Sequence, residues 1–470
     1  MKLFRLTSFF IACAFSQIGF ASSSTMPTPG SPKTFAAPKI EVTTLKEGIQ
    51  LTHIQNKTTP LTRMTVIAWN GVGSEGATGE AGLSSLSADL LLRATESKTT
   101  DEVMQAFQRL AADIQTSTLM DHTQLAIDVL SETLAPTLKL LDSLLINDTL
   151  NADDLERVRR KHLQALIQEA DQPRTLAVRK FFEVVYEGHP MQRWRSGKEA
   201  DITTLGAKRI QDWQRTTWSK TAIDIVVVSS LSLAQVKEAL LTNLSQTLAA
   251  HTGTSRPTIA TLTKPKAASP KLIWVDKPGA SQSVLMLGKA LDKPSNEREA
   301  RELGNDVLGG QFSARINLNL REDKGYTYGA YSRILNYQHG STFYASTSVR
   351  ADVTAASLTE MLKEVREIKA DKPVSEREFK EVQTSAVLKW PSQFSPGSRL
   401  VYALVGLLRE GHAPTTIVKE AEALGKVNMQ EAQTSLNALL NNDYPWTLIV
   451  VGDAAKWKES VEALNWESLL

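Results

Sequence analysis

The segment GGQFSARINLNLREDKGYTYGAYS, residues 309–332, decides how the fold of this chain is interpreted. Its pattern predicts a helix that ends at Arg321, a reversal at Gly325 and a strand that bears Tyr328. The helix is expected to pack through Phe312, Ile316, Leu318 and Leu320, and the strand to alternate through Tyr326, Tyr328 and Ala330. A guanidinium and a phenol are therefore presented seven residues apart, across a glycine turn.

A stretch rich in small and polar residues, 251–270, divides the chain into an N-terminal domain, 39–250, and a C-terminal domain, 271–470. Both domains begin with short apolar strands, continue with amphipathic helices and close on a strongly apolar strand. The strands are expected at 49–54, 61–69, 223–228, 272–276, 284–289 and 447–451, and the helices at 101–112, 152–169, 297–308 and 375–389. Thr100 and the pair Ser295 and Asn296 are candidate helix caps. The repeated order predicts a diverged duplication of the α+β class, with a sheet covered by helices in each domain.

A second motif, GEAGLSSLSADLLLRAT at residues 79–95, connects the chain to a known family. Together with residues 309–332 it resembles the pitrilysin or insulinase-type metallopeptidases, the inverted zincins, which include the mitochondrial processing peptidase. Active members have H-x-x-E-H on a helix that follows a Gly-Ser turn. The residues that flank the motif in the family are present here: Gly73-Ser74 matches the turn, Gly82-Leu83 the start of the helix and Thr95 the end of the motif. The resemblance implies two homologous two-layer domains, each an antiparallel or mixed sheet covered by helices, arranged as a duplicated bowl around a chamber.

The zinc chemistry of that motif is missing. Ser85 and Asp89 occupy the two histidine positions, Ala88 occupies that of the general base, and Ala165 that of the third ligand. None of the seven histidines pairs with another at helical ligand spacing. Ser85 and Asp89 could form a new hydrogen-bonded pair or a weak metal site, but a drifted patch behind the core stripe of Leu83, Leu86 and Leu90 is favoured. We therefore expect no metal in this chain.

The resemblance gives Arg321 and Tyr328 a role. In the family, residues at these positions reach toward the metal and hold the peptide near the scissile bond, where a phenol and a permanent cation stabilise the oxyanion. The alternative is that the pair is a stacking or solubility feature, since an arginine and a tyrosine at this spacing also occur by chance. Gly309-Gly310 matches the family's glycine-rich entry and lacks the Lys-Ser/Thr of a phosphate loop.

The N-terminus and the charge balance predict the compartment. Residues 1–21 resemble a cleaved secretory signal, and 22–38 a flexible tether, so we expect a soluble, exported protein of a bacterial periplasm. Cys13, the only cysteine, makes a poor lipidation site. Cleavage removes two of 53 basic residues and none of 51 acidic ones, which leaves a formally neutral chain. Neither nucleic acid nor a membrane span is predicted.

These observations favour a metal-free subunit of a heterodimeric zinc endopeptidase, similar to the non-zinc subunits of the mitochondrial processing peptidase and of bacterial heterodimeric peptidases. A homologous partner would supply zinc and the general base, and the substrates would be unfolded peptides added to a sheet edge. The alternative is a non-catalytic scaffold or peptide-binding protein of the same fold. A self-sufficient hydrolase built on Ser85 is disfavoured, because no histidine and aspartate partners are evident.

Overall fold

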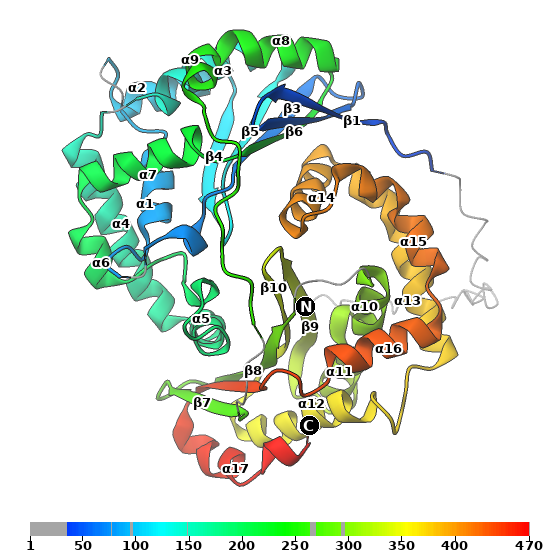
Figure 1. The fold of residues 1–470 in the computed structure, drawn as a ribbon. Helices are drawn as coiled ribbons and strands as arrows, with labels where there is room; N and C mark the ends of the chain where they lie inside the picture. Colours follow the sequence, from blue (N-terminus) through cyan, green and yellow to red (C-terminus); the bar gives the residue numbers. More distant parts are fainter. Residues whose placement is uncertain are drawn as a thin grey trace, which may run out of the picture. The chain divides into compact units, whose positions relative to one another are not determined.

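Two mixed sheets, one in each half of the chain, form the framework of the computed structural model (Figure 1). The structure describes residues 35–469 except 77, 95–96, 148, 264–268 and 293–296. The predicted signal, Cys13, nearly all of the tether, Thr95, Ser295 and Asn296 thus lie outside the described residues. Ala37–Leu470 is one compact unit, and the description below concerns that unit alone.

The first sheet has the strand order β1-β2-β6-β3-β5-β4 among the described residues. Its strands are β1 Ile40–Lys46, β2 Ile49–Gln55, β3 Leu61–Ala68, β4 Asp113–Thr118, β5 Thr123–Leu130 and β6 Ile223–Ser229. Only β2 and β6 pair in parallel; the remaining neighbours are antiparallel.

The second sheet repeats this plan with the order β7-β11-β8-β10-β9. Its strands are β7 Lys271–Asp276, β8 Gln282–Leu291, β9 Thr327–Tyr337, β10 Gly340–Arg350 and β11 Thr447–Gly452. The parallel pair is β7 with β11, which corresponds to β2 with β6. Each strand of the second sheet therefore has a counterpart in the first, and β9 lies at an edge, as β4 does. The predicted duplication with a mixed sheet in each half is confirmed.

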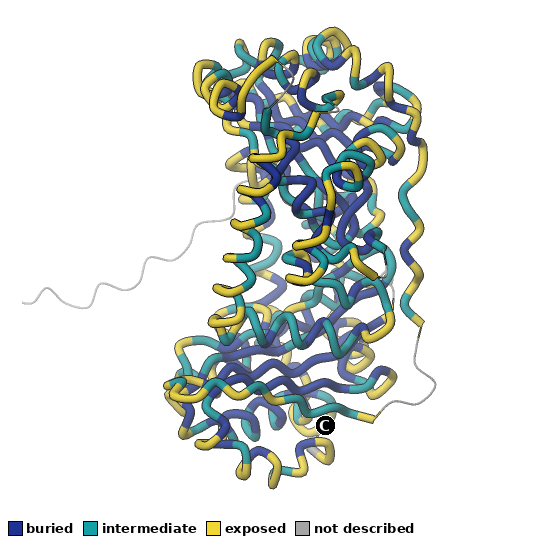
Figure 2. Tube along the Cα trace, turned by 90° about the vertical axis from the view of Figure 1, so that its left-hand side faces the viewer, coloured by how far each residue is buried: buried dark blue, intermediate teal, exposed yellow. Residues whose placement is uncertain are grey.

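Helices of the same half cover one face of each sheet. Those of the first half are α1 Leu83–Leu90, α2 Thr100–Arg109, α3 Leu134–Leu145, α4 Ala152–Asp171, α5 Pro173–Val185, α6 Glu199–Thr204, α7 Ala207–Ser219, α8 Leu233–Asn243 and α9 Ser245–Ala250. Those of the second half are α10 Arg298–Asn305, α11 Arg315–Asn317, α12 Thr354–Glu367, α13 Glu376–Lys389, α14 Gly397–Glu410, α15 Glu420–Lys426, α16 Met429–Leu439 and α17 Lys458–Glu462. The buried residues follow both sheets and the helix faces turned toward them (Figure 2).

Two of these helices, α14 and α5, instead cover the second face of the sheet in the other half. The α14 side chains Leu400 and Leu404 pack on Val226 and Val228 of β6. In return, α5 lies on the second sheet, where Phe181 joins the cluster that includes residues of β8 and β11. Every residue of β6 and of β11 is buried, because each of these strands needs cover on both faces. The exchange joins the halves through two apolar clusters, in which each fully buried large side chain contributes about 2 kcal/mol.

The described part of the segment between the two sheets packs against both halves. The guanidinium of Arg256 lies 3.4 Å from the ring centroid of Trp69, and one of its nitrogens lies 3.3 Å from Asp224 Oδ2. The indole nitrogen of Trp69 donates to the same carboxylate at 2.6 Å. Farther along, the amide of Leu262 donates to the carbonyl of His339 in the second half. The described part of this segment, which we call the strap, therefore contacts both halves.

Capping side chains decide where several helices begin, and the structure changes some of the predicted boundaries. Ser375 is the N-cap of α13 in a capping box with Glu378, so the helix predicted at 375–389 begins one residue later, at Glu376. The cap of α2 is Thr99 rather than Thr100, because the hydroxyl of Thr99 accepts the amide of Glu102. The helix predicted at 297–308 ends at Asn305 and continues as a π-helical turn, Asp306–Gly310. No helix in the described part of the chain combines the length and apolar character needed to cross a bilayer.

Candidate functional site

The helix with the degenerate zinc motif is α1. Gly82, with a φ of 98°, begins it in a conformation that favours glycine, and Leu83, Leu86 and Leu90 are buried against α4 and α7. Upstream, Val72–Ser74 forms a short 3-10 turn where the Gly-Ser turn was predicted. The core stripe of the motif is therefore preserved as the sequence indicates.

Glu75 holds the start of α1 through hydrogen bonds. Its carboxylate accepts the amide and the hydroxyl of Ser84, at 2.8 and 2.6 Å, and the amide of Gly82 at 3.2 Å. Burial raises the pKa of Glu75 to about 7, although these hydrogen bonds oppose the rise. Glu75 is a neutral or half-ionised structural group at pH 7, and its atoms are occupied by the helix start.

The residues at the former ligand positions are engaged elsewhere. The Ser85 hydroxyl donates to the carbonyl of Arg195 at 2.6 Å, and Ala88 is buried. Asp89 Oδ2 lies 3.1 Å from His162 Nε2 and 3.4 Å from Lys161 Nζ, both on α4. Burial raises the pKa of Asp89, but its contacts with His162 and Lys161 outweigh that effect and hold the pKa below its usual value.

This arrangement does not fit zinc. Ala165 lies on α4, one turn beyond His162, and offers no ligand. The Lys161 ammonium already pairs with the Asp89 carboxylate, so its positive charge would repel a metal cation from that carboxylate. Nowhere in the described ranges do three or more histidine, cysteine, aspartate or glutamate side chains form a group able to hold a metal ion. The Ser85–Asp89 pair, which the sequence left open but disfavoured, is not formed, since each side chain has other partners.

Arg321 and Tyr328 line one cavity, which we call the clamp cavity. It has a volume of about 510 Å³ and is bounded by the π-helical turn at Asp306–Gly310, a second π-helical segment, Leu318–Asp323, and the start of β9. Single π-turns within helices are frequent at functional sites. None of Ser85, Ala88, Asp89 and Ala165 lines this cavity. The structure thus brings the predicted pair together and keeps it apart from the degenerate motif.

A β-bulge sets the position of Tyr328. Thr347 of β10 pairs with Ala330, and Val349 pairs with Thr327, so that Ser348 faces two residues, Tyr328 and Gly329. The Tyr328 side chain is 91% exposed. Nearby, Asn317 fixes the strand, because its side chain accepts the amide of Ala330 at 3.0 Å. The simple strand alternation predicted for Tyr326, Tyr328 and Ala330 is therefore wrong, because the extra residue re-aims the phenol.

Arg321 contacts the aromatic ring of Phe312. Its guanidinium lies 4.5 Å from the ring centroid of Phe312, and its Nε lies 3.4 Å from the carboxylate of the adjacent Glu322. Ile316 and Leu320 are fully buried as predicted, whereas Phe312 and Leu318 are 65% and 41% exposed. The expected packing of those two side chains in the core is wrong: Phe312 precedes the helix and its ring contacts the Arg321 guanidinium, and Leu318 begins the π-helical segment.

The sequence did not single out three further residues of the clamp cavity, Arg174, Tyr331 and Arg333. Tyr331 and Arg333 are two positions apart on β9, and period-two alternation would have placed them on one face. Arg174 comes from α5 of the other half, and one of its terminal nitrogens donates to the Tyr331 hydroxyl at 3.1 Å. No local pattern signals that contact, because the exchange of helices creates it.

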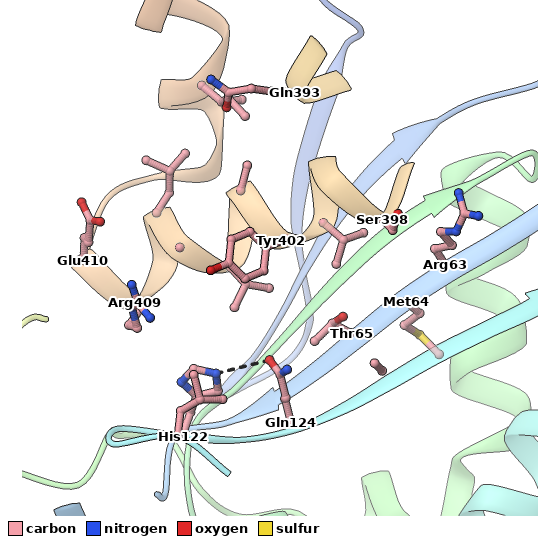
Figure 3. Close-up of a pocket in the computed structure, with 18 of the residues that line it drawn as sticks. Arg63, Met64, Thr65, His122, Gln124, Gln393, Ser398, Tyr402, Arg409 and Glu410 are labelled. Atoms are coloured by element: carbon pink, nitrogen blue, oxygen red, sulfur yellow. Dashed lines mark hydrogen bonds between the residues drawn. The ribbon is translucent and has the colours of Figure 1, made fainter. Parts of the chain in front are cut away.

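A second cavity, of about 470 Å³, lies between α14 and the first sheet. Figure 3 shows Tyr402 of α14 pointing into the space opposite Thr65, His122 and Gln124. Within this cavity the charges are compensated: Arg298 lies within 3.5 Å of three carboxylates, those of Glu302, Glu410 and Glu420. The sequence did not predict this cavity either, because α14 reaches the first sheet only through the tertiary exchange.

Comparisons with known proteins agree with the geometry. Residues 54–193 match the family described as insulinase (peptidase family M16), and residues 204–386 match the peptidase M16 inactive domain. The chain is 24% identical over 354 residues to an uncharacterized zinc protease of Mycobacterium bovis, covering 73% of this chain and 76% of that protein. It is 22% identical over 414 residues to the uncharacterized zinc protease YmxG of Bacillus subtilis, covering 86% and 97%.

Solved structures share the fold. A peptidase M16 inactive domain from Pseudomonas fluorescens superimposes with a TM-score of 0.80 at 20% identity, covering 88% of this chain and 98% of that one. A protease from Helicobacter pylori superimposes with a TM-score of 0.79 at 19% identity, covering 88% and 100%. The two matched families together span more than half of the sequence.

Proposed function

Because this chain belongs to the insulinase family, peptidase family M16, we propose that it is the metal-free subunit of an exported heterodimeric zinc metallopeptidase. A homologous partner with an intact H-x-x-E-H motif supplies the zinc ion and the general base. This chain contributes Arg321 and Tyr328, which bind the peptide and stabilise the oxyanion formed at its carbonyl. The substrates are unfolded or extended peptides.

One observation supports this function above the others: the β-bulge exposes the Tyr328 phenol in the same cavity as Arg321. A tyrosine used for packing would bury its ring, whereas 91% of this side chain is left available to a group from outside. Meanwhile the former metal positions are occupied by side-chain contacts that exclude a cation. Both features are expected of a subunit that holds the substrate for a metal located in another chain.

The chemistry assigned to this chain is limited to hydrogen bonding and charge. The Tyr328 hydroxyl donates to the developing oxyanion, and the Arg321 guanidinium adds a permanent positive charge. Removal of one such donor typically lowers kcat by about a hundredfold to a thousandfold. No proton transfer is assigned to either residue, because neither needs to change its protonation state.

The test compares this chain, its zinc-binding partner and their mixture in a fluorogenic peptide assay. We expect activity only in the mixture, and a loss of about a hundredfold in kcat with Tyr328→Phe or Arg321→Ala. Tyr402→Phe and Arg377→Ala change exposed residues outside the clamp cavity and serve as controls; Tyr402 is 80% exposed, and the Arg377 side chain is 87% exposed. A mixture whose rate is the same with either clamp substitution would refute the proposal.

The alternative function, a non-catalytic scaffold or peptide-binding protein, is favoured by the loss of all four zinc-motif positions. A scaffold would bind its partner and peptides but leave the partner's turnover unchanged. Full activity of the zinc-binding partner alone would therefore support the scaffold. Chelator-sensitive activity of this chain alone would contradict both functions.

A further inference from the structure

The clamp cavity is strongly basic. Three arginines line it, Arg174, Arg321 and Arg333, and its described lining contains no aspartate or glutamate. The remaining lining groups are aromatic rings, amides, hydroxyls and glycines. Three guanidiniums around one cavity repel each other unless an anion lies between them, so the composition is typical of an anion-binding site.

Two of these arginines, Arg174 and Arg333, lie beside one ring, that of Tyr331. The guanidinium of Arg174 lies 5.5 Å from the ring centroid of Tyr331, and that of Arg333 lies 5.1 Å from it. The Tyr331 hydroxyl accepts from Arg174 at 3.1 Å, and its ring packs against Tyr344 of β10 at 6.3 Å between centroids. Stacking and the hydrogen bond reduce the freedom of both long side chains, which lowers the entropic cost of binding a ligand.

No carboxylate of the described residues neutralises the positive charges of Arg174 and Arg333. Among the described residues, no carboxylate lies within ion-pair distance of either. The acidic residues near Arg174 in the sequence have other partners: Asp171 pairs with Lys277 at 3.4 Å, and Glu183 pairs with Arg179 at 3.1 Å. Arg298 in the second cavity, by contrast, faces three carboxylates. The clamp cavity therefore lacks the anion that the protein supplies elsewhere.

We propose that Arg174 and Arg333, positioned by Tyr331, form a subsite for a carboxylate of the peptide held by Arg321 and Tyr328. The subsite rests on the proposed function, since it assumes that the ligand is a peptide. A planar guanidinium matches a carboxylate in bidentate geometry, and the edge strand β9 offers a backbone to an extended chain beside it. The carboxylate belongs either to a glutamate or aspartate side chain or to the C-terminus of the peptide.

The location of the subsite couples it to the fold. Arg174 lies at the second position of α5, the helix that the first half places on the second sheet. Arg333 lies on β9 of the second half. The subsite is therefore complete only when the two halves are packed together. Each half contributes one arginine that binds the carboxylate of the peptide.

The experiment measures peptide binding to the purified chain by fluorescence anisotropy. Three labelled ten-residue peptides are compared: one with a central glutamate and an amidated C-terminus, its glutamine counterpart, and the glutamine peptide with a free C-terminal acid. We expect one of the two acidic peptides to bind about tenfold to a hundredfold more tightly than the neutral peptide, and the advantage to shrink at high salt. The peptide that gains identifies the source of the carboxylate.

Arg174→Gln and Arg333→Gln should each reduce the advantage, and the double variant should abolish it. Tyr331→Phe keeps the ring but removes the hydroxyl that accepts from Arg174, so it should weaken binding of the acidic peptide less than Arg174→Gln does. Arg377→Gln, on an exposed helix face, is the matched control and should change nothing. Circular dichroism of each variant separates loss of binding from loss of folding.

Two outcomes would overturn the subsite. Equal binding of all three peptides would refute carboxylate recognition and leave the clamp function intact, because the clamp holds any peptide backbone. An advantage that persists in the double variant would place the recognition elsewhere. If no peptide binds at all, the subsite is refuted, and the activity of the mixture with its zinc-binding partner decides the clamp function separately.

Discussion

Gly309→Ala tests whether the clamp cavity depends on close backbone contact. Gly309 lies in the π-helical turn beside β9, and a Cβ atom there would stand 2.5 Å from Ser332 Oγ and 2.6 Å from the Ser332 amide nitrogen. Ordinary contacts begin at about 3.4 Å, so the turn and the strand must separate by about 0.9 Å. The amide is part of β9 and cannot turn aside as a side chain can.

The expected cost follows from two terms. Overpacking of a tight contact costs about 1 to 3 kcal/mol. The separation also strains the hydrogen bond from the Ser332 hydroxyl to Asn305 Oδ1, 2.7 Å long and buried, which adds about 1 kcal/mol. We expect the free energy of unfolding to fall by about 2 to 4 kcal/mol. Because β9 also presents Tyr328, the activity of the mixture should drop by up to about a hundredfold.

The assay is urea unfolding followed by tryptophan fluorescence and circular dichroism, with the same substitution at Gly329 as a control. A Cβ at Gly329 would meet only Asn317 Oδ1, at 3.9 Å, so Gly329→Ala should unfold within about 0.5 kcal/mol of the unsubstituted chain. Gly309→Ala with unchanged stability would show that the turn and strand are not in rigid contact, and the reasoning would fail.

Three further substitutions test other contacts. In the unsubstituted chain, the buried Glu75 has a pKa of about 7 when folded and about 4.5 when unfolded. The free energy of unfolding should therefore fall by roughly 3 kcal/mol as the pH rises from about 4.5 to about 7. Glu75→Gln should flatten this pH dependence, because glutamine does not ionise. Urea titrations at pH 5 and 8 would show it, and an unchanged slope would contradict it. Tyr186→Phe removes the hydroxyl that donates to the Ser341 carbonyl at 2.9 Å between α5 and the second sheet, and should lower the unfolding free energy by about 1 to 2 kcal/mol in denaturant. Arg256→Ala removes the cation held 3.3 Å from Asp224 and should lower the thermal midpoint by a few degrees in calorimetry; no shift would show that the strap adds no stability.

Much of the fold could be predicted from local pattern. The closing strands are short, strongly apolar runs rich in β-branched residues, which is typical of buried strands, and the amphipathic runs at 152–169 and 375–389 indicated α4 and α13. The family resemblance assigns Ser85 and Ala88 to positions of H-x-x-E-H, and neither residue can supply the imidazole or carboxylate of that motif. The seven-residue spacing of Arg321 and Tyr328 was equally visible.

The geometry of the site needed the tertiary structure. The bulge that exposes Tyr328 arises from pairing with a strand about twenty residues away in sequence, and the π-helical segments that border the clamp cavity have no sequence signature. The contact of Asp89 with His162 depends on the packing of α1 against α4. In each case a partner distant in sequence supplies the deciding contact, which no window of neighbouring residues contains.

The sequence by itself indicated the duplicated α+β plan and showed that the chain has no H-x-x-E-H motif, because both depend on residue type and spacing. Only the tertiary structure decided that each half lends a helix to the other, and that Arg174 therefore meets Tyr331 and Arg333 in a cavity without a carboxylate. The physical reason is that burial acts on whole surfaces: both faces of β6 and β11 require apolar cover, and the chain satisfies that requirement through distant segments.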